Sequence, residues 1–203
     1  MYSGIKDLFQ KCIKIIDKKF YKYFYLYFFL SVIGGILETI SIGMLIPILA
    51  LVTDASESNS SLSFFFKFIN TLGFTSDNQQ IIFLSTSLII IYILKNLFLG
   101  LIVNFQFNVT AKIQTELSNN LFDDYFKLSY EFHKKKNSSE VVRDVLGETT
   151  QFARGLVFNF LNLLLNFLLS LFIIIFLFLT EFNSTIMITF LSLIFGTIFL
   201  KFF

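Results

Sequence analysis

The chain has 203 residues, of which 55% are hydrophobic, 19% aromatic and only 15% charged, with a formal net charge of +2. This composition excludes a disordered chain, and the small net charge gives no reason to expect a nucleic-acid partner. The single cysteine, Cys12, and the single histidine exclude an internal disulfide and argue against a zinc site. Because the apolar excess lies in long runs, the sequence indicates a membrane protein.

Residues 1–23 are predicted to form an amphipathic helix on the cytoplasmic side of a membrane. Apolar residues recur there at spacings of three and four, and the lysines lie mostly on the opposite face. A helix of this kind suits the surface of an anionic inner leaflet. Packing against the protein's own helices is the alternative interpretation.

Residues 24–203 are predicted to form an all-α, polytopic membrane domain with spans over residues 24–52, 81–107, 156–179 and 186–203, since about 20 apolar residues cross a bilayer. Thirteen lysines and arginines lie in the N-terminal segment and in residues 108–155, against one in residues 53–80 and none in 180–185. By the positive-inside rule, the N-terminus and residues 108–155 are cytoplasmic. We therefore expect a multi-pass protein of the inner or plasma membrane.

Two of the predicted helices are too long for the bilayer. The apolar pattern of the second span continues without proline to Leu128, and 48 residues at 1.5 Å each reach about 72 Å, against about 30 Å of hydrocarbon. Asn137 with Glu140 three residues later is typical of a helix start, and no proline follows before Leu179. We expect both helices to extend into the cytoplasm and to be joined at a tip within residues 129–136.

This layout is accompanied by short motifs: Leu37-Glu38-Thr39, Ile42-Gly43, Ile46-Pro47, Lys95-Asn96-Leu97-Phe98 and Asn137-Ser138-Ser139-Glu140-Val141-Val142-Arg143. In both respects the chain resembles the transmembrane domain of ATP-binding-cassette (ABC) exporters, and most closely the flippases for lipid-linked oligosaccharides and other polysaccharide precursors. The resemblance implies a membrane domain that moves a lipid-linked or amphipathic substrate by alternating access. It also implies three partners: the lipid bilayer, a fused or separate nucleotide-binding domain that holds ATP and magnesium, and a second exporter half, as in a homodimer.

The chain departs from this family in two respects. A full exporter half has six membrane helices followed by an ATPase domain, whereas four spans are predicted here. The sequence contains no Gly-x-x-x-x-Gly-Lys-Ser/Thr loop, so the chain is not expected to bind ATP or to act as an enzyme by itself. We interpret it as the N-terminal part of such a protein. The alternative is a non-transporting four-span membrane scaffold or assembly protein.

The resemblance also implies that the tip between the second and third helices is a coupling helix, which sits in a groove of the nucleotide-binding domain. Aromatic side chains would serve as apolar anchors there, with lysines as a polar rim. The residues are Tyr130, Phe132, His133, Lys134, Lys135 and Lys136. An ordinary basic loop that obeys the positive-inside rule is the alternative.

Polar residues within the predicted spans are the other candidates for function. Glu38 and Lys95 lie near the middle of consecutive, antiparallel spans, so we expect them to pair or to share a polar cavity. Such a pair can fix helix register, serve the transport pathway or relay protons. In the third span Asn159, Asn162, Asn166 and Ser170 share one helix face, which we expect to face the helix bundle or a water-filled pathway.

Overall fold

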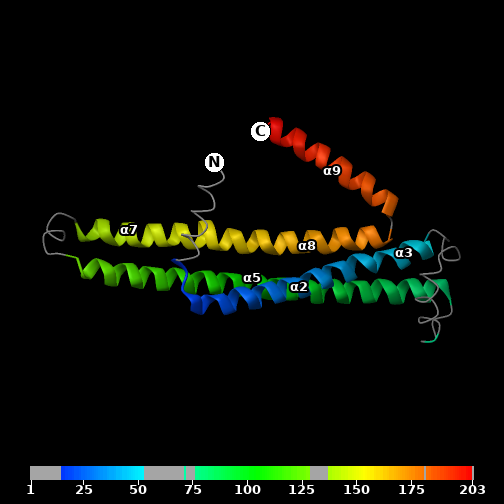
Figure 1. Ribbon diagram of the computed structural model, residues 1–203. Helices are drawn as coiled ribbons and strands as arrows, with labels where there is room; N and C mark the ends of the chain where they lie inside the picture. The colour runs from blue at the N-terminus through cyan, green and yellow to red at the C-terminus, as the bar shows by residue number, and fades with distance from the viewer. Residues whose placement is uncertain (1–14, 53–70, 72–75, 129–136, 181, 203) are drawn as a thin grey trace. The chain divides into compact units, whose positions relative to one another are not determined.

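The computed structural model describes residues 15–52, 71, 76–128, 137–180 and 182–202, and the regular elements in these ranges are all helical. The predicted all-α class is therefore confirmed for the described residues. Figure 1 labels the main elements. In chain order they are η1 (Lys18–Phe20), α2 (Tyr21–Gly43), α3 (Leu45–Val52), α5 (Asp77–Phe126), α7 (Ser138–Thr150), η3 (Gln151–Phe158), α8 (Asn159–Thr180) and α9 (Phe182–Phe202).

Three helical stretches are long and apolar enough to cross a membrane: Lys18–Leu51, Asn78–Phe126 and Ser139–Thr180. They contain the first three predicted spans, apart from Val52 at the end of the first. The fourth predicted span corresponds to α9, whose apolar stretch Thr185–Phe199 is shorter than the other three. Three such stretches are compatible with a multi-pass membrane protein, and a fourth crossing remains a prediction.

The first predicted span is divided between two helices, α2 and α3, with Met44 in a turn between them. Pro47 lies in the first turn of α3. Its ring would clash with the carbonyl of the residue four positions earlier, which is Gly43, the last residue of α2. The interruption therefore lies where the proline makes a continuous helix unfavourable.

The two long helices predicted from the sequence are both present. α5 has 50 residues and is about 75 Å long at the usual rise per residue. α7, η3 and α8 follow one another without a break, and the stretch Ser139–Thr180 has 42 residues, or about 63 Å. Each is about twice the thickness of the hydrocarbon core.

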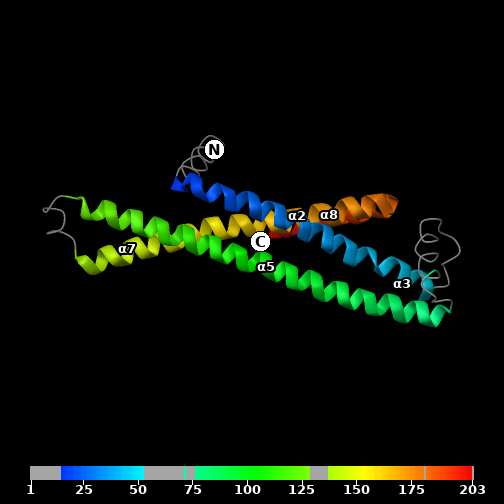
Figure 2. The ribbon, with the colours of Figure 1, turned by 90° about the horizontal axis from the view of Figure 1, so that it is seen from below.

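The chain divides into two compact units, and α2, α5 and α8 contribute to both. The first unit comprises residues 1–31 and 100–166. In it the C-terminal part of α5 lies beside α7, as Figures 1 and 2 both show. Apolar side chains are buried along both: Val109 and Ile113 in α5, Val141 and Val145 in α7, and Ala153 and Val157 in η3.

In α7, η3 and the first part of α8, the buried positions recur at every fourth residue from Val141 to Leu165. In an α-helix with 3.6 residues per turn, a spacing of four would move each successive side chain steadily around the helix. η3, which is a π-helix with wider turns, lies in the middle of this run. The wider turns compensate for the drift. One apolar stripe therefore faces α5 along the helical hairpin that α5 forms with α7, η3 and α8.

The second unit comprises residues 32–99 and 167–203. Leu51 of α3 and Leu84 of α5 form a buried cluster, against which Ile48, Ile81 and Phe83 pack. At the α2–α8 contact, a methyl group added at Gly35 would lie 2.5 Å from Cδ2 of Phe172. Any larger residue at this position would therefore force the Phe172 ring or the helices to shift, because a Cβ atom does not approach a ring carbon so closely.

Gly35→Ala is expected to lower the free energy of unfolding by about 1–3 kcal/mol through overpacking against Phe172. Unfolding in detergent micelles, followed by circular dichroism, measures the change. Gly100→Ala is the matched control, because nothing lies within 4 Å of the added methyl group. The better helix propensity of alanine should stabilise that variant by up to about 1 kcal/mol. Equal stability of the two variants would show that the contact at Gly35 is wrong.

Candidate functional site

A buried ion pair joins α2 to α5. Lys95 Nζ lies 2.6 Å from Glu38 Oε1, and the two side chains are only 5% and 19% exposed. The same ammonium lies 4.3 Å from the centre of the Tyr92 ring, a cation–π contact that adds to its stabilisation. The structure thus brings together the two charged residues that the sequence places in the middle of the apolar runs.

The surroundings of the pair indicate what it can do. An isolated charge at the centre of a membrane helix costs about 2.5–3.5 kcal/mol, and pairing offsets part of that cost. Among the described residues, the side-chain contacts of the pair are with each other and with an aromatic ring. This arrangement suits an ion pair that fixes the register of α2 against α5 better than it suits a proton relay.

A second polar contact, which the sequence analysis did not predict, links α2 and α5 to the junction of η3 with α8. Gln106 donates from Nε2 to the carbonyl of Phe158 at 2.9 Å, and the Tyr27 hydroxyl lies 3.1 Å from both Gln106 Oε1 and the carbonyl of Leu161. Gln106 and Tyr27 are each 1% exposed. The available signal was a glutamine in the predicted apolar run 81–107, which the sequence analysis did not single out.

The amide of Gln106 reaches the chain at the end of the π-helical segment. A change from i→i−5 to i→i−4 hydrogen bonds skips one carbonyl within the π-helical segment. In this segment the carbonyl of Gly155 accepts from the side chain of Asn159 at 2.8 Å. Phe158 is the last residue of η3, and Leu161 lies in the first turn of α8. Gln106 and Tyr27 therefore attach α5 and α2 to the chain around this junction.

Farther along the hairpin, toward the end of α5, side-chain hydrogen bonds continue the contact. Gln114 donates to the hydroxyl of Thr150 at 2.8 Å, and the hydroxyls of Ser118 and Thr149 lie 2.8 Å apart. Ser118 and Thr149 are both buried. The two helices are thus joined by polar contacts as well as by apolar packing.

The predicted polar stripe of α8 is exposed: Asn159, Asn162, Asn166 and Ser170 all face away from the side that Leu161, Leu165 and Leu168 bury. Two of these side chains bond to their own helix, Asn159 to the carbonyl of Gly155 at 2.8 Å and Asn166 to the carbonyl of Asn162 at 3.0 Å. A separate exposed strip consists of Phe160, Leu163 and Phe167. α8 therefore presents a buried apolar face, an exposed polar face and an exposed apolar face.

The predicted coupling tip, which is Tyr130, Phe132, His133, Lys134, Lys135 and Lys136, lies outside the described residues, as do residues 1–14 of the predicted interfacial helix. The flanking elements end close to the predicted positions, with α5 ending at Phe126 and α7 beginning at Ser138. Asn137 directly precedes α7. Its side chain makes no capping hydrogen bond, and its backbone oxygen accepts from the amides of Glu140 and Val141 instead.

Within the described part of the chain, no three His, Cys, Asp or Glu side chains gather closely enough to hold a metal ion. No family model matches the chain, and no curated protein matches it.

A double-mutant cycle measures the ion pair directly. Glu38→Gln and Lys95→Gln should each lower the free energy of unfolding in detergent micelles by about 3 kcal/mol, because each leaves a buried charge unpaired. The double variant should lose clearly less than the sum, with a coupling energy of at least about 1 kcal/mol. Lys19 and Glu116, a partly exposed pair, serve as the control and should couple by about 0–1 kcal/mol. Additive losses at Glu38 and Lys95 would mean that the two do not interact.

Proposed function

We propose that this chain is the membrane-domain part of an ATP-driven exporter or flippase, which moves a lipid-linked or otherwise amphipathic substrate across the inner or plasma membrane by alternating access. The supporting observation is the length and pairing of two helices: α5 on one side, and α7, η3 and α8 on the other. We further propose four membrane crossings, with α9 as the fourth, and a cytoplasmic N-terminus.

The hairpin has the properties required of a lever. If residues 81–107 of α5 occupy the membrane, then Asn108–Phe126 extends about 28 Å beyond it. Over this length α5 is held to α7 by the Gln114–Thr150 and Ser118–Thr149 hydrogen bonds and by a buried apolar stripe. Two helices packed in this way move together, so a displacement at the tip is transmitted to the membrane part. Ordinary connections between membrane spans are short and would not need such an extension.

The polar face of α8 supports the transport part of the proposal. Hydrocarbon offers no partner to an asparagine side chain, and hydrogen bonds to the preceding turn use only part of what an amide group can donate and accept. The polar face of α8 is therefore stable in a membrane only if a polar neighbour, such as water or another polar surface, lies against it. We propose that this neighbour is a substrate pathway lined by α8 and by a second exporter half related to this chain, as in a homodimer.

The energy for transport would come from ATP and magnesium bound to a nucleotide-binding domain, which can be fused to this chain or separate from it. The tip that contains Tyr130 and Phe132 would dock into that domain. A four-span scaffold or assembly protein, the alternative from the sequence, requires neither a water-accessible face on α8 nor coupling to an ATPase. These two properties separate the two functions experimentally.

Water access to α8 is the first test. In a Cys12→Ser background, Asn162→Cys and Asn166→Cys should react with a membrane-impermeant, water-soluble thiol reagent in proteoliposomes. Leu163→Cys and Phe167→Cys are the matched controls, since these side chains are 65% and 61% exposed but lie on the apolar strip. The asparagine positions should react at least about tenfold faster, because a thiol reacts as the thiolate, which needs a polar environment. Equal protection at all four positions would exclude a pathway along this face.

Coupling is the second test. In the chain together with its ATPase domain, Tyr130→Ala with Phe132→Ala should uncouple ATP hydrolysis from transport and leave membrane insertion intact, because aromatic anchors dominate interfaces. Changing Lys134, Lys135 and Lys136 together to Gln should have a smaller effect, since exposed charges at a rim contribute little. If protease cleaves the tip freely in the intact, nucleotide-bound complex, the tip is not docked and the lever proposal fails.

A further inference from the structure

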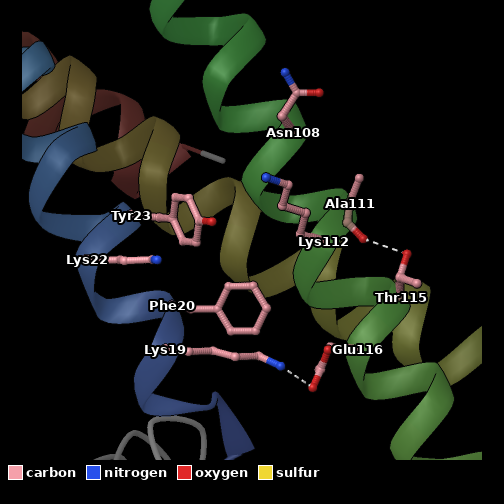
Figure 3. A pocket seen from close by; sticks show the side chains of 9 residues that line it. All are labelled: Lys19, Phe20, Lys22, Tyr23, Asn108, Ala111, Lys112, Thr115 and Glu116. Atoms are coloured by element: carbon pink, nitrogen blue, oxygen red, sulfur yellow. Dashed lines mark hydrogen bonds and ion pairs between the residues drawn. The ribbon is translucent and has the colours of Figure 1, made fainter.

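An open cleft of about 490 Å³ lies between the beginning of α2 and the middle of α5, in the first unit of the chain. One side carries Lys19 and Phe20 of η1 with Lys22 and Tyr23 of α2, and the α5 side extends from Asn108 to Glu116 (Figure 3). The volume is in the range of ligand-binding pockets, about 300–1,000 Å³. Nothing in the proposed transport mechanism uses this cleft.

The cleft carries a net charge of +2, because its lining contains three lysines and one glutamate. Lys19 is already neutralised, since it forms an ion pair with Glu116 and also lies 3.7 Å from Asp17. Figure 3 shows Lys19 and Glu116 pairing across the cleft. Lys22 and Lys112 form no ion pair with any carboxylate among the described residues. The uncompensated charge of the cleft therefore belongs to these two lysines.

Lys22 and Lys112 are held close together by one aromatic ring. Their ammonium groups lie 5.2 Å and 5.1 Å from the centre of the Tyr23 ring, so they are no more than about 10 Å apart. Two like charges at that distance, about one Debye length at physiological salt, repel each other. The ring offsets part of this repulsion through cation–π contacts. An anion between the two ammonium groups would offset it more fully.

The position of the cleft along the helices indicates which anion is available. Lys22 lies two residues before the first predicted span, and Lys112 lies five residues after the end of the second. Both helices therefore leave their apolar stretches at the cleft, which places it at the boundary between hydrocarbon and water. Phospholipid phosphates lie at this boundary, as do tyrosines such as Tyr23 in membrane proteins generally.

We propose that this cleft binds the phosphate group of an anionic phospholipid from the leaflet on the basic side of the membrane. Lys22 and Lys112 supply the charge, and the Asn108 side chain, which lines the same cleft, supplies an amide donor. Phe20, which is 5% exposed, and Tyr23 provide apolar surface for the glycerol and the upper acyl chains. Basic pockets between membrane helices on the cytoplasmic side are known to bind anionic headgroups in this way.

The chain contains no tryptophan, so a single introduced tryptophan reports on its own surroundings. Tyr23→Trp keeps an aromatic ring between the lysines and places the probe in the cleft. The full chain is reconstituted in phosphatidylcholine vesicles that contain either brominated phosphatidylglycerol or brominated phosphatidylcholine, and quenching of the tryptophan is compared. Phe190→Trp, on an exposed position of α9, reports the bulk lipid and also checks insertion.

We expect the Tyr23→Trp probe to prefer phosphatidylglycerol, and Lys22→Gln with Lys112→Gln to reduce the preference by roughly tenfold to thirtyfold, since each lysine near the surface contributes about 1 kcal/mol. Lys127→Gln with Lys201→Gln removes two charges elsewhere and should leave it unchanged. Lys22→Arg with Lys112→Arg should retain the preference for phosphatidylglycerol.

The proposal is wrong if the preference at position 23 is no greater than at position 190, or if the variant with both lysines changed to glutamine keeps the preference. If excess soluble glycerol phosphate abolishes the preference, the cleft takes free phosphate esters and the lipid assignment is overturned.

Discussion

Hydrocarbon offers no hydrogen-bond partner, and this constraint accounts for much of what the apolar helices of this chain do with their polar groups. Lys95 is paired with Glu38, and Gln106 is bonded to the Phe158 carbonyl and to Tyr27. Smaller side chains follow the same rule by bonding to the preceding turn, as Ser31 and Thr39 do with the carbonyls of Tyr27 and Gly35. These contacts also position the helices, because a partner on another helix fixes register where apolar packing alone would allow sliding.

The lack of hydrogen-bond partners in hydrocarbon also applies to the asparagines of α8. Asn159 and Asn166 also bond to the preceding turn, yet they lie on an exposed face with Asn162 and Ser170. An exposed polar face within an apolar helix is stable in a membrane only beside water or another polar surface. This requirement connects the structure of α8 to the proposed transport pathway. In the proposed function, the part of the hairpin beyond the membrane would connect that helix to an ATPase domain.

The sequence predicted the helices well, because length, apolar content and the absence of proline determine helices in a membrane. α5 extends over Asp77–Phe126 where residues 81–128 were expected, and α7 begins directly after Asn137. The pairing of Glu38 with Lys95 could be anticipated from depth alone, since two charges at the same level of antiparallel helices reach each other. The position of the helix break at Met44 was harder to predict, because a proline such as Pro47 indicates a distortion without giving its exact position.

Other features depended on packing between distant parts of the chain, so the sequence alone did not identify the partners of the residues involved. The π-helical turn from Gln151 to Phe158 follows from the need to keep a stripe of every fourth residue against α5. The contact of Tyr27 with Gln106 and Leu161 joins residues 79 and 134 positions apart. The cleft at Tyr23 likewise forms only when the beginning of α2 meets the middle of α5. Periodicity identifies the faces of a helix, but it does not identify their partners.

The central claim is that α5 is one continuous helix that lies partly in the membrane and partly in water. Spin labels at exposed positions along α5, in the Cys12→Ser chain in lipid vesicles, test it through collisions with oxygen and with a water-soluble nickel chelate. Labels at Ile93 and Leu97 should be accessible to oxygen and protected from the chelate, and labels at Asn119 and Asp123 should show the reverse. Helical periodicity should continue without interruption through Phe107. Asn119 and Asp123 at the same depth as Ile93, or a loss of periodicity near Phe107, would contradict the account.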